Sequence, residues 1–259
     1  MNLDDYLRRI NYSGPLNADA ETLRNLHIAH LRNVPFENLS IHCGEPIVLT
    51  DEALFRKIVE NRRGGFCYEL NGLFAWLLRQ IGFDVSMLSA GVAHGEGGFS
   101  PDFDHMVLVT NLDRRWLVDV GFGDSFVEPL LLEGEIEQQQ GTQTFRINSA
   151  DLHLVLMRRS ADEEWKPQYR FTLQPYQYAD YEEMCRYHQT SPESHFTKSR
   201  LCSLATSDGR LTLSGMRLIE TSNQHREEKT VANEEEYEKL LRDRFGIVMK
   251  LGSISLGRT

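Results

Sequence analysis

A cysteine that follows a glycine pair is the best-placed nucleophile in this sequence. Cys67 ends the run Arg-Arg-Gly-Gly-Phe-Cys, and apolar residues then recur at helical spacing from Leu70 to Ile81. We therefore expect Cys67 in the first turn of an amphipathic helix, where unpaired backbone N–H groups and the helix dipole favour a thiolate. The competing interpretation is that Cys67 is only a small buried apolar residue, as most free cysteines are.

A nucleophilic cysteine needs a base within hydrogen-bond reach and a group that orients this base. His105 and Asp119 are the candidates, because they lie in two alternating segments that are predicted to form a hairpin. With Leu112 at the tip of the turn, His105 lies directly opposite Asp119, whereas a slip of one residue would put Asp119 on the other face. His105 would then take the thiol proton while Asp119 orients the imidazole. A polar pair that only joins two strands is the alternative.

Other reactive side chains do not form a recognisable metal site or disulfide framework. His27 and His30 are three residues apart on a predicted helix, but no carboxylate or third ligand stands near them in the sequence, so we interpret them as ordinary helix residues. The four cysteines show no Cys-x-x-Cys pairing, which predicts four reduced thiols and no bound metal. They are Cys43, Cys67, Cys185 and Cys202.

The composition excludes several classes of partner. The chain has 38 acidic and 28 basic residues, a net charge of −10, which disfavours binding to nucleic acid or to an anionic membrane surface. No apolar run approaches the roughly 18 residues of a membrane span, and the first residues are acidic where a secretory signal would be basic. We therefore expect a cytoplasmic protein without a membrane or nucleic-acid partner.

The predicted elements place the three reactive residues in two regions. Residues 1 to about 84 are predicted to be helical, with a helix that begins at an Asn17 cap and ends before Pro35, and another capped by Thr50. Beyond this region the apolar period changes from 3.6 to 2, which predicts an antiparallel sheet or barrel. Its strands are expected at 85–93, 105–110, 115–120, 144–148, 152–158 and 168–173. A helix at 180–188, strands at 201–205 and 210–219, and a last helix from an Asn233 cap to Gly246 should follow.

Five short motifs occur in an order that carries a family resemblance. They are Val-Pro-Phe-Glu-Asn-Leu at 34–39, Arg-Gly-Gly-Phe-Cys-Tyr-Glu at 63–69, Asp-His-Met at 104–106, Val-Asp-Val-Gly-Phe-Gly at 118–123 and Thr-Ser-Pro-Glu-Ser-His-Phe-Thr at 190–197. Each motif is weak alone, but together they span most of the chain. The sequence resembles the arylamine N-acetyltransferase family.

The resemblance implies an α+β fold in three parts with a cysteine-protease-like catalytic core. These are an N-terminal helical bundle (1–84) that carries the nucleophile, a central antiparallel β-barrel (85–185) that carries His105 and Asp119, and a C-terminal α/β lid (186–259). The implied chemistry is a two-step transfer, in which Cys67 takes acetyl from acetyl-CoA and an aromatic amine or hydrazine removes it. Acetyl-CoA is then a substrate, with no tightly bound cofactor.

The resemblance also implies roles for residues around the triad. Coenzyme contacts are expected from Asp104, Gly121 and Tyr187. Glu37 and Arg63 are expected to form a buried pair that braces the active-site loop. The acceptor pocket is expected to be lined by Phe122, Asp124 and Phe126. A carboxylate at position 124 should disfavour acidic acceptors such as aminobenzoates.

Two other functions use the same residues in the same order. One is an amide synthase, which moves a polyketide chain from a carrier protein onto its own aryl amine and closes a macrolactam. The other is a Cys-His-Asp hydrolase of the transglutaminase type. The flanking motifs favour the acetyltransferase over the hydrolase, but the triad alone does not separate the acetyltransferase from the amide synthase.

Overall fold

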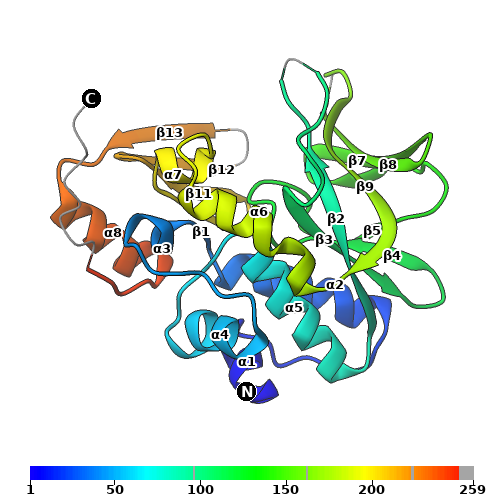
Figure 1. The fold of residues 1–259 in the computed structure, drawn as a ribbon, viewed down its shortest axis with the longest axis horizontal. Helices are drawn as coiled ribbons and strands as arrows, with labels where there is room; N and C mark the ends of the chain where they lie inside the picture. Colours follow the sequence, from blue (N-terminus) through cyan, green and yellow to red (C-terminus); the bar gives the residue numbers. More distant parts are fainter. Residues whose placement is uncertain (96, 162, 223–224, 251–259) are drawn as a thin grey trace.

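The computed structural model describes residues 1–95, 97–161, 163–222 and 225–250. They form helices and two antiparallel sheets, so the expected α+β class is confirmed (Figure 1). The N-terminal helices are α1 (Leu3–Arg9), α2 (Ala20–Asn33), α3 (Leu39–His42), α4 (Asp51–Phe55), the π-helical turn η1 (Arg56–Glu60) and α5 (Cys67–Ile81). The later helices are α6 (Tyr178–Thr190), α7 (His195–Lys198) and α8 (Glu234–Phe245).

The larger sheet has eight strands in the order β5-β4-β3-β2-β9-β8-β7-β6. Their bounds are β2 (Asp84–Val92), β3 (His105–Asn111), β4 (Arg115–Val118), β5 (Leu130–Leu131), β6 (Gln138–Gln140), β7 (Gln143–Ala150), β8 (His153–Ser160) and β9 (Lys166–Tyr176). The smaller sheet has the order β1-β10-β11-β12-β13. Its strands are β1 (Phe36–Glu37), β10 (Leu201–Ala205), β11 (Gly209–Ser214), β12 (Arg217–Ser222) and β13 (His225–Thr230).

Glutamine side chains connect the two edges of the larger sheet. The amide of Gln138 on β6 accepts from Leu131 N at 2.8 Å and donates to Leu131 O at 3.0 Å, as a neighbouring strand's peptide would. Gln140, two residues after Gln138, makes similar contacts. Its amide accepts from Val127 N and Glu128 N and donates to Glu128 O. These contacts satisfy exposed edge groups and give the sheet its nearly closed, barrel-like form.

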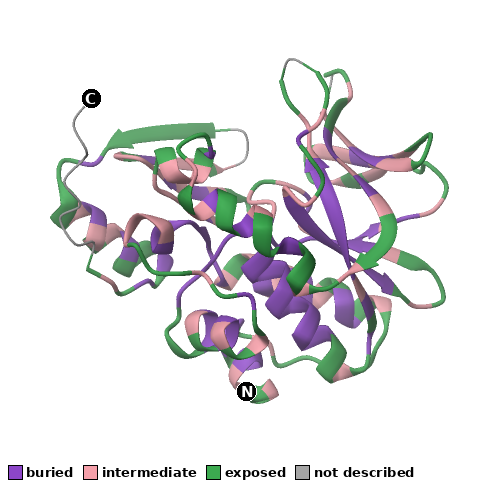
Figure 2. Cartoon of the chain, viewed as in Figure 1, coloured by how far each residue is buried: buried purple, intermediate pink, exposed green. Residues whose placement is uncertain are grey.

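Helix α5 is the centre of the main core. Its residues 67–78 are all buried, and Figure 2 shows this helix as an almost continuous buried element. On one side its apolar residues pack on α1 and the α4 region, and on the other they meet Met87 of β2 together with Met106 and Leu108 of β3. A helix that is apolar around most of its circumference must be enclosed in this way. The first residue of this helix is therefore fixed from several sides.

The short strand β1 joins the loop before Cys67 to the smaller sheet. Phe36 and Glu37 pair with Ser203 and Cys202 of β10, and Glu37 N donates to Gly65 O at 2.8 Å. Gly64 has to be glycine here, because a Cβ would lie 1.9 Å from a backbone carbonyl oxygen of the preceding segment. The sheet that contains β10–β13 thus includes a strand from the N-terminal region, and the division at 84/85 and 185/186 stays a prediction.

Several local predictions need correction. The N-cap of α2 is Asp19, whose carboxylate accepts from Thr22 N at 2.8 Å, and not Asn17. The single strand expected at 210–219 is two strands, because Gly215 adopts a left-handed φ of +54° and turns the chain back. The charged stretch that follows forms β13, whose residues are all exposed, so it has no apolar alternation to detect. The caps at Thr50, Asn233 and Gly246 are confirmed.

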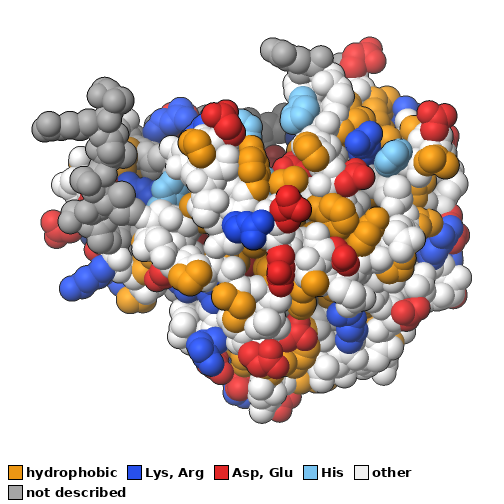
Figure 3. Space-filling view, in the orientation of Figure 1, with side chains coloured by type: hydrophobic (Ala, Val, Ile, Leu, Met, Phe, Trp, Pro, Cys, Tyr) orange, Lys and Arg blue, Asp and Glu red, His pale blue; other side chains and the backbone are white. Residues whose placement is uncertain are grey.

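Figure 3 shows acidic and basic side chains mixed over the visible face and not gathered into one basic patch. Among the described residues, every helix is too short or too polar to cross a bilayer.

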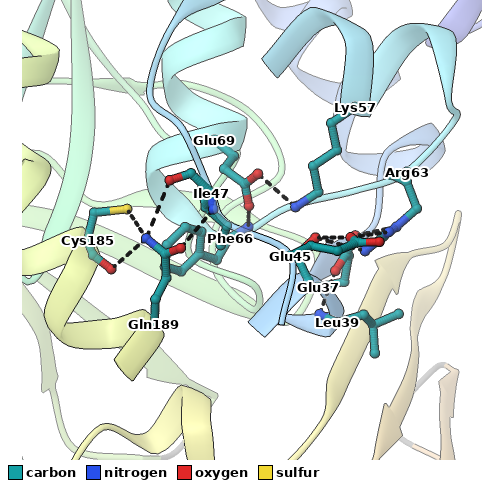
Figure 4. Close-up of polar contacts among 11 residues, drawn as sticks. Glu37, Leu39, Glu45, Ile47, Lys57, Arg63, Phe66, Glu69, Cys185 and Gln189 are labelled. Atoms are coloured by element: carbon teal, nitrogen blue, oxygen red, sulfur yellow. Dashed lines mark hydrogen bonds and ion pairs between the residues drawn. The ribbon is translucent and has the colours of Figure 1, made fainter. Parts of the chain in front are cut away.

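A buried ion pair holds the loop before Cys67 against β1 (Figure 4). Arg63 Nη2 lies 2.8 Å from Glu37 Oε1, and both side chains are almost fully enclosed. The second carboxylate oxygen of Glu37 accepts from Leu39 N at 2.7 Å. Although burial raises the pKa of Glu37, Lys57, Arg63 and Leu39 N together hold it below its ordinary value. The pair therefore fits the bracing role that the resemblance implied for these two residues.

We expect Arg63→Met to destabilise the protein by about 3–5 kcal/mol at pH 7, because it leaves the Glu37 carboxylate buried without its closest counterion. Urea unfolding measures this difference. Since the folded pKa of Glu37 is depressed, the pair stabilises the protein above the unfolded pKa and loses this effect as the pH falls through the folded one. The difference between wild type and variant should therefore shrink below about pH 4.

The matched control is Arg8→Met, which removes an exposed ion pair with Asp5 and should cost less than about 1 kcal/mol. Equal unfolding midpoints for Arg63→Met and Arg8→Met would contradict the bracing role of Arg63.

Candidate active site

The predicted nucleophile begins α5. Phe66 is the N-cap with extended backbone, and Cys67 is the first helical residue, 3% exposed. The Glu69 carboxylate accepts from Phe66 N at 3.1 Å and pairs with Lys57 Nζ at 2.7 Å, as Figure 4 shows. An acidic residue in the first turn also suits the positive end of the helix dipole. The backbone on both sides of the sulfur is thus tied down by buried polar contacts.

His105 and Asp119 are in direct contact, but the predicted hairpin register is wrong. Asn111 pairs with Arg115, so the turn is centred on Asp113 and not on Leu112, and β4 ends at Val118. Continuing this register would place His105 opposite Gly121. A turn displaced by one residue shifts the pairing by two, which keeps Asp119 on the same face as His105. Asp119 therefore reaches His105 diagonally, and its Oδ2 lies 2.8 Å from His105 Nε2.

The other oxygen of Asp119 is held by two donors. Asn71 Nδ2 on α5 and the backbone N of Gly121 each lie 2.9 Å from Asp119 Oδ1. Asn71 also accepts from Val120 N at 2.9 Å and donates to Met106 O at 2.6 Å. Burial raises the pKa of the Asp119 carboxyl, but His105, Asn71 and Gly121 N outweigh it and lower the pKa below its ordinary value. Asp119 is therefore a carboxylate at neutral pH. Asn71 is a residue that the sequence analysis missed.

His27 is a second residue that the sequence analysis missed. Its Nδ1 lies 2.8 Å from Val127 O, and its Nε2 lies 3.1 Å from Asp119 O and 3.3 Å from Asp119 N. Burial lowers the pKa of His27 to about 4, so the ring is neutral at pH 7 and carries one N–H. With one N–H, the ring donates either from Nδ1 to Val127 O or from Nε2 to Asp119 O, and each tautomer keeps the ring against the Asp119 backbone. His27 thus fixes the backbone of Asp119.

Gly121, two residues after Asp119, packs directly on the backbone of Cys67, the predicted nucleophile. A Cβ on Gly121 would lie 2.8 Å from Cys67 Cα and 2.7 Å from Asn71 Nδ2. Only glycine lets the chain after Asp119 approach the first turn of α5 so closely. Gly121 therefore brings the chain after Asp119 against the first turn of α5, while Asp119 itself contacts His105. Among the described residues, no group of three or more metal-ligand side chains is placed to hold an ion.

Burial opposes ionisation of the Cys67 thiol. It raises the pKa of Cys67 well above the ordinary value, with smaller contributions in the same direction from the Asp104 and Asp119 carboxylates, while a backbone hydrogen bond at Met106 lowers it. Burial therefore acts against the favourable effect expected of the helix N-terminus. A thiolate at this buried position needs a cation close by, and His105 stays the predicted one.

The other predicted site residues are placed as follows. The Phe122 ring packs on the His105 ring, with centroids 5.2 Å apart. Phe126 is 2% exposed and stacks on His27 at 5.7 Å, so its ring is part of the barrel core, and its role as a pocket residue stays a prediction. Asp104 directly precedes His105, and Tyr187 is on the exposed side of α6. Their coenzyme contacts also stay predictions.

Asp124 has two arginine partners that the sequence did not reveal. Its carboxylate is 72% exposed and lies 3.4 Å from Arg158 Nη1 on β8 and 3.2 Å from Arg210 Nε on β11. The three side chains carry a net charge of +1, so the Asp124 carboxylate is not an isolated negative charge. Its place beside the acceptor stays a prediction. The cluster also links the larger sheet to the smaller one.

Comparisons with known proteins agree on one family. A family profile described as N-acetyltransferase matches residues 19–254. The arylamine N-acetyltransferase pineal gland isozyme NAT-10 of Gallus gallus is 37% identical, over 96% of this chain and 95% of its own. Proansamycin X synthase of Amycolatopsis mediterranei is 32% identical, over 92% and 95%. The structure of Mycobacterium marinum arylamine N-acetyltransferase in complex with CoA superposes with a TM-score of 0.88 and 33% identity, over 95% of this chain and 93% of that one.

We expect iodoacetamide to label Cys67 at pH values well below the ordinary thiol pKa of about 8.5, because His105 can hold the proton as an imidazolium. In His105→Gln, labelling should require a pH above the ordinary thiol pKa, because burial raises the pKa of Cys67 and no counter-cation then opposes it. Mass spectrometry of the peptide that contains Cys67 follows the reaction.

The half-exposed Cys43 is replaced by alanine in both proteins, so that its thiol does not consume reagent. Superimposable pH profiles for the two proteins would contradict the assignment of His105 as the proton acceptor.

Proposed function

Because this chain belongs to the arylamine N-acetyltransferase family, we propose that it transfers an acetyl group from acetyl-CoA to the nitrogen of an arylamine or arylhydrazine through a thioester on Cys67. The observation that carries this proposal is the His105–Asp119 pair, 2.8 Å apart, beside a cysteine at a helix start. Acetyl-CoA is a substrate in this scheme, and no tightly bound cofactor takes part. The four free thiols agree with a cytoplasmic location.

In the first step His105 takes the proton of Cys67, and the thiolate attacks the acetyl carbonyl carbon. The bond to the coenzyme sulfur breaks, and His105 returns its proton to the CoA thiolate. Asp119 stabilises the imidazolium that exists between these proton transfers and holds Nε2 as the donor, so that Nδ1 is free for the sulfur. The acetyl group is then a thioester on Cys67.

In the second step the amine nitrogen attacks the thioester carbonyl. The carbon–sulfur bond breaks, His105 takes a proton from the amine, and this proton returns to Cys67 as the amide leaves. Phe122 packs on His105 and is the side chain best placed to contact an aromatic acceptor. Asp104, Gly121 and Tyr187 are proposed as coenzyme contacts, with Asp124 and Phe126 at the acceptor side.

A second candidate function is that of an amide synthase. One relative, which this chain matches over 92% of its length, is named a synthase and not an acetyltransferase. The same Cys67 thioester would then carry a longer acyl chain, delivered by a carrier protein. The donor that acylates Cys67 separates the two functions.

Incubation with acetyl-CoA should increase the intact mass by one acetyl group, and addition of an uncharged alkoxyaniline should remove it. Cys67→Ala should gain no acetyl group, whereas Cys43→Ala should behave as wild type, because Cys43 lies outside the site. Mass spectrometry of the intact protein measures all four cases.

If wild type gains no acetyl group, the acetyltransferase proposal is wrong. An adduct that forms but is not removed by any arylamine would favour the amide synthase.

The charge cluster around Asp124 predicts acceptor preference. Because Arg158 and Arg210 outnumber the carboxylate, p-aminobenzoate should be acetylated at least as efficiently as p-anisidine. The measured quantity is kcat/KM for p-aminobenzoate divided by kcat/KM for p-anisidine. Arg210→Gln should lower this ratio about fivefold and Asp124→Asn should raise it by a similar factor, which corresponds to about 1 kcal/mol.

Arg217→Gln is the matched control, since this arginine pairs with Glu228 at the far edge of the smaller sheet. A ratio that is the same in all three variants would mean that this cluster does not face the acceptor.

A further inference from the structure

A second histidine connects the C-terminal part of the chain to the strand that carries His105. His188 on α6 is 5% exposed, with Nδ1 3.0 Å from Ser194 Oγ and Nε2 3.1 Å from Asp104 Oδ1. The contact with Asp104 is close but is not a well-aligned hydrogen bond, because Nε2 has no acceptor in line. Ser194 Oγ already accepts from Phe196 N at 3.2 Å, so its hydroxyl is free to donate to Nδ1.

Asp104 is held on several sides and directly precedes His105. Its Oδ2 accepts from Ser100 Oγ at 2.7 Å, and its backbone O lies 3.2 Å from the hydroxyl of Tyr68, the residue after Cys67. Burial raises the pKa of Asp104, but His188 and Ser100 lower it below the ordinary value. The carboxylate is therefore charged, and the Nε2 side of the His188 ring faces it at 3.1 Å. Removing His188 would leave this half-buried carboxylate, just before β3, with Ser100 but without the histidine.

The same segment also touches the residue before the nucleophile. The Phe196 ring lies edge-on to His188, with centroids 5.1 Å apart, and edge-on to Phe66 at 5.5 Å. The segment from His188 to Phe196 therefore contacts the neighbours of both reactive residues, Phe66 beside Cys67 and Asp104 beside His105. A displacement of this segment would alter both positions together.

We infer that His188 is a positioning residue for His105, which acts by holding Asp104 and thus the first residue of β3. The serine, histidine and aspartate resemble a hydrolase triad, but the Ser194 hydroxyl is buried, caps α7 and is directed at a histidine whose other side meets Asp104. The arrangement is therefore structural support for the His105–Asp119 pair. This inference rests on the proposed function for its kinetic readout, but not for its labelling readout.

The test uses His188→Leu, which keeps the apolar contacts with Tyr68 and Phe196 and removes both nitrogens. We expect kcat for acetyl transfer to fall about tenfold, because the variant misplaces the base, and the KM for acetyl-CoA to change less than kcat, because the proposed coenzyme contact of Asp104 is disturbed only indirectly. The pH profile of Cys67 labelling should move about one unit higher. His188→Gln, which can still accept from Ser194 and donate to Asp104, should recover most of the loss.

A double-mutant cycle tests whether His188 acts through Asp104. In the Cys67 labelling readout, which needs no coenzyme, His188→Leu/Asp104→Asn should be less impaired than His188→Leu alone, because a neutral amide loses less than a carboxylate when its partner is removed. His195→Leu is the control, since this exposed histidine is seven residues further along the same segment.

The inference is overturned if His188→Leu matches His195→Leu in both readouts, if only KM changes, or if the cycle is additive. If His188→Leu does not fold, His188→Gln and the cycle built on it decide between these outcomes. Loss of acetyl transfer in wild type would instead defeat the proposed function, while the labelling shift would still test His188.

Discussion

The arrangement of the site depends on one constraint, which is that the buried Asp119 carboxylate must be fully hydrogen-bonded. A carboxylate at 1% exposure is tolerated only when its oxygens are fully hydrogen-bonded, and here His105, Asn71 and Gly121 N supply three donors. These donors come from β3, from α5 and from the turn that follows Asp119, while His27 of α2 fixes the backbone. Folding to satisfy one charge therefore brings together the elements that form the site.

Helix periodicity places Cys67, the proposed nucleophile, next to the same hydrogen-bond network. Cys67 and Asn71 are four residues apart on α5, so they lie on one face of the helix, one turn from each other. The face that offers Asn71 to Asp119 must then present Cys67 to the same region, and Gly121 allows the backbone to close over it. A single helix thus carries both the sulfur and the amide that holds the orienting carboxylate.

The sequence was informative where local rules decide the outcome. The start of α5 and its apolar face follow from the helical period of the apolar residues. His105 and Asp119 were predicted to share one side of the sheet, and this stayed correct although the register was wrong, because the pairing shifted by two residues. Contacts between distant segments were not accessible. Arg210 meets Asp124 across 86 residues, and Gln138 closes the barrel with a side chain that mimics a peptide, so no local pattern reports either contact. His27 was interpreted as an ordinary helix residue because nothing in its own helix indicates that it binds the backbone of Asp119.

Burial of Cys67 and reactivity of Cys67 are compatible only if the proton stays inside the site. Releasing it to water would leave a thiolate beside the Asp119 carboxylate in a nearly closed environment, which is the situation that raises the pKa of the thiol. In the proposed mechanism the proton moves to His105, which leaves the total charge of Cys67, His105 and Asp119 unchanged at −1 and pairs the new positive charge with the Asp119 carboxylate. The 2.8 Å contact of Asp119 with Nε2 therefore favours the imidazolium at the point where the sulfur needs a cation. In the proposed mechanism, the Asp119 carboxylate, whose burial is costly, is thus the group that allows a buried cysteine to react.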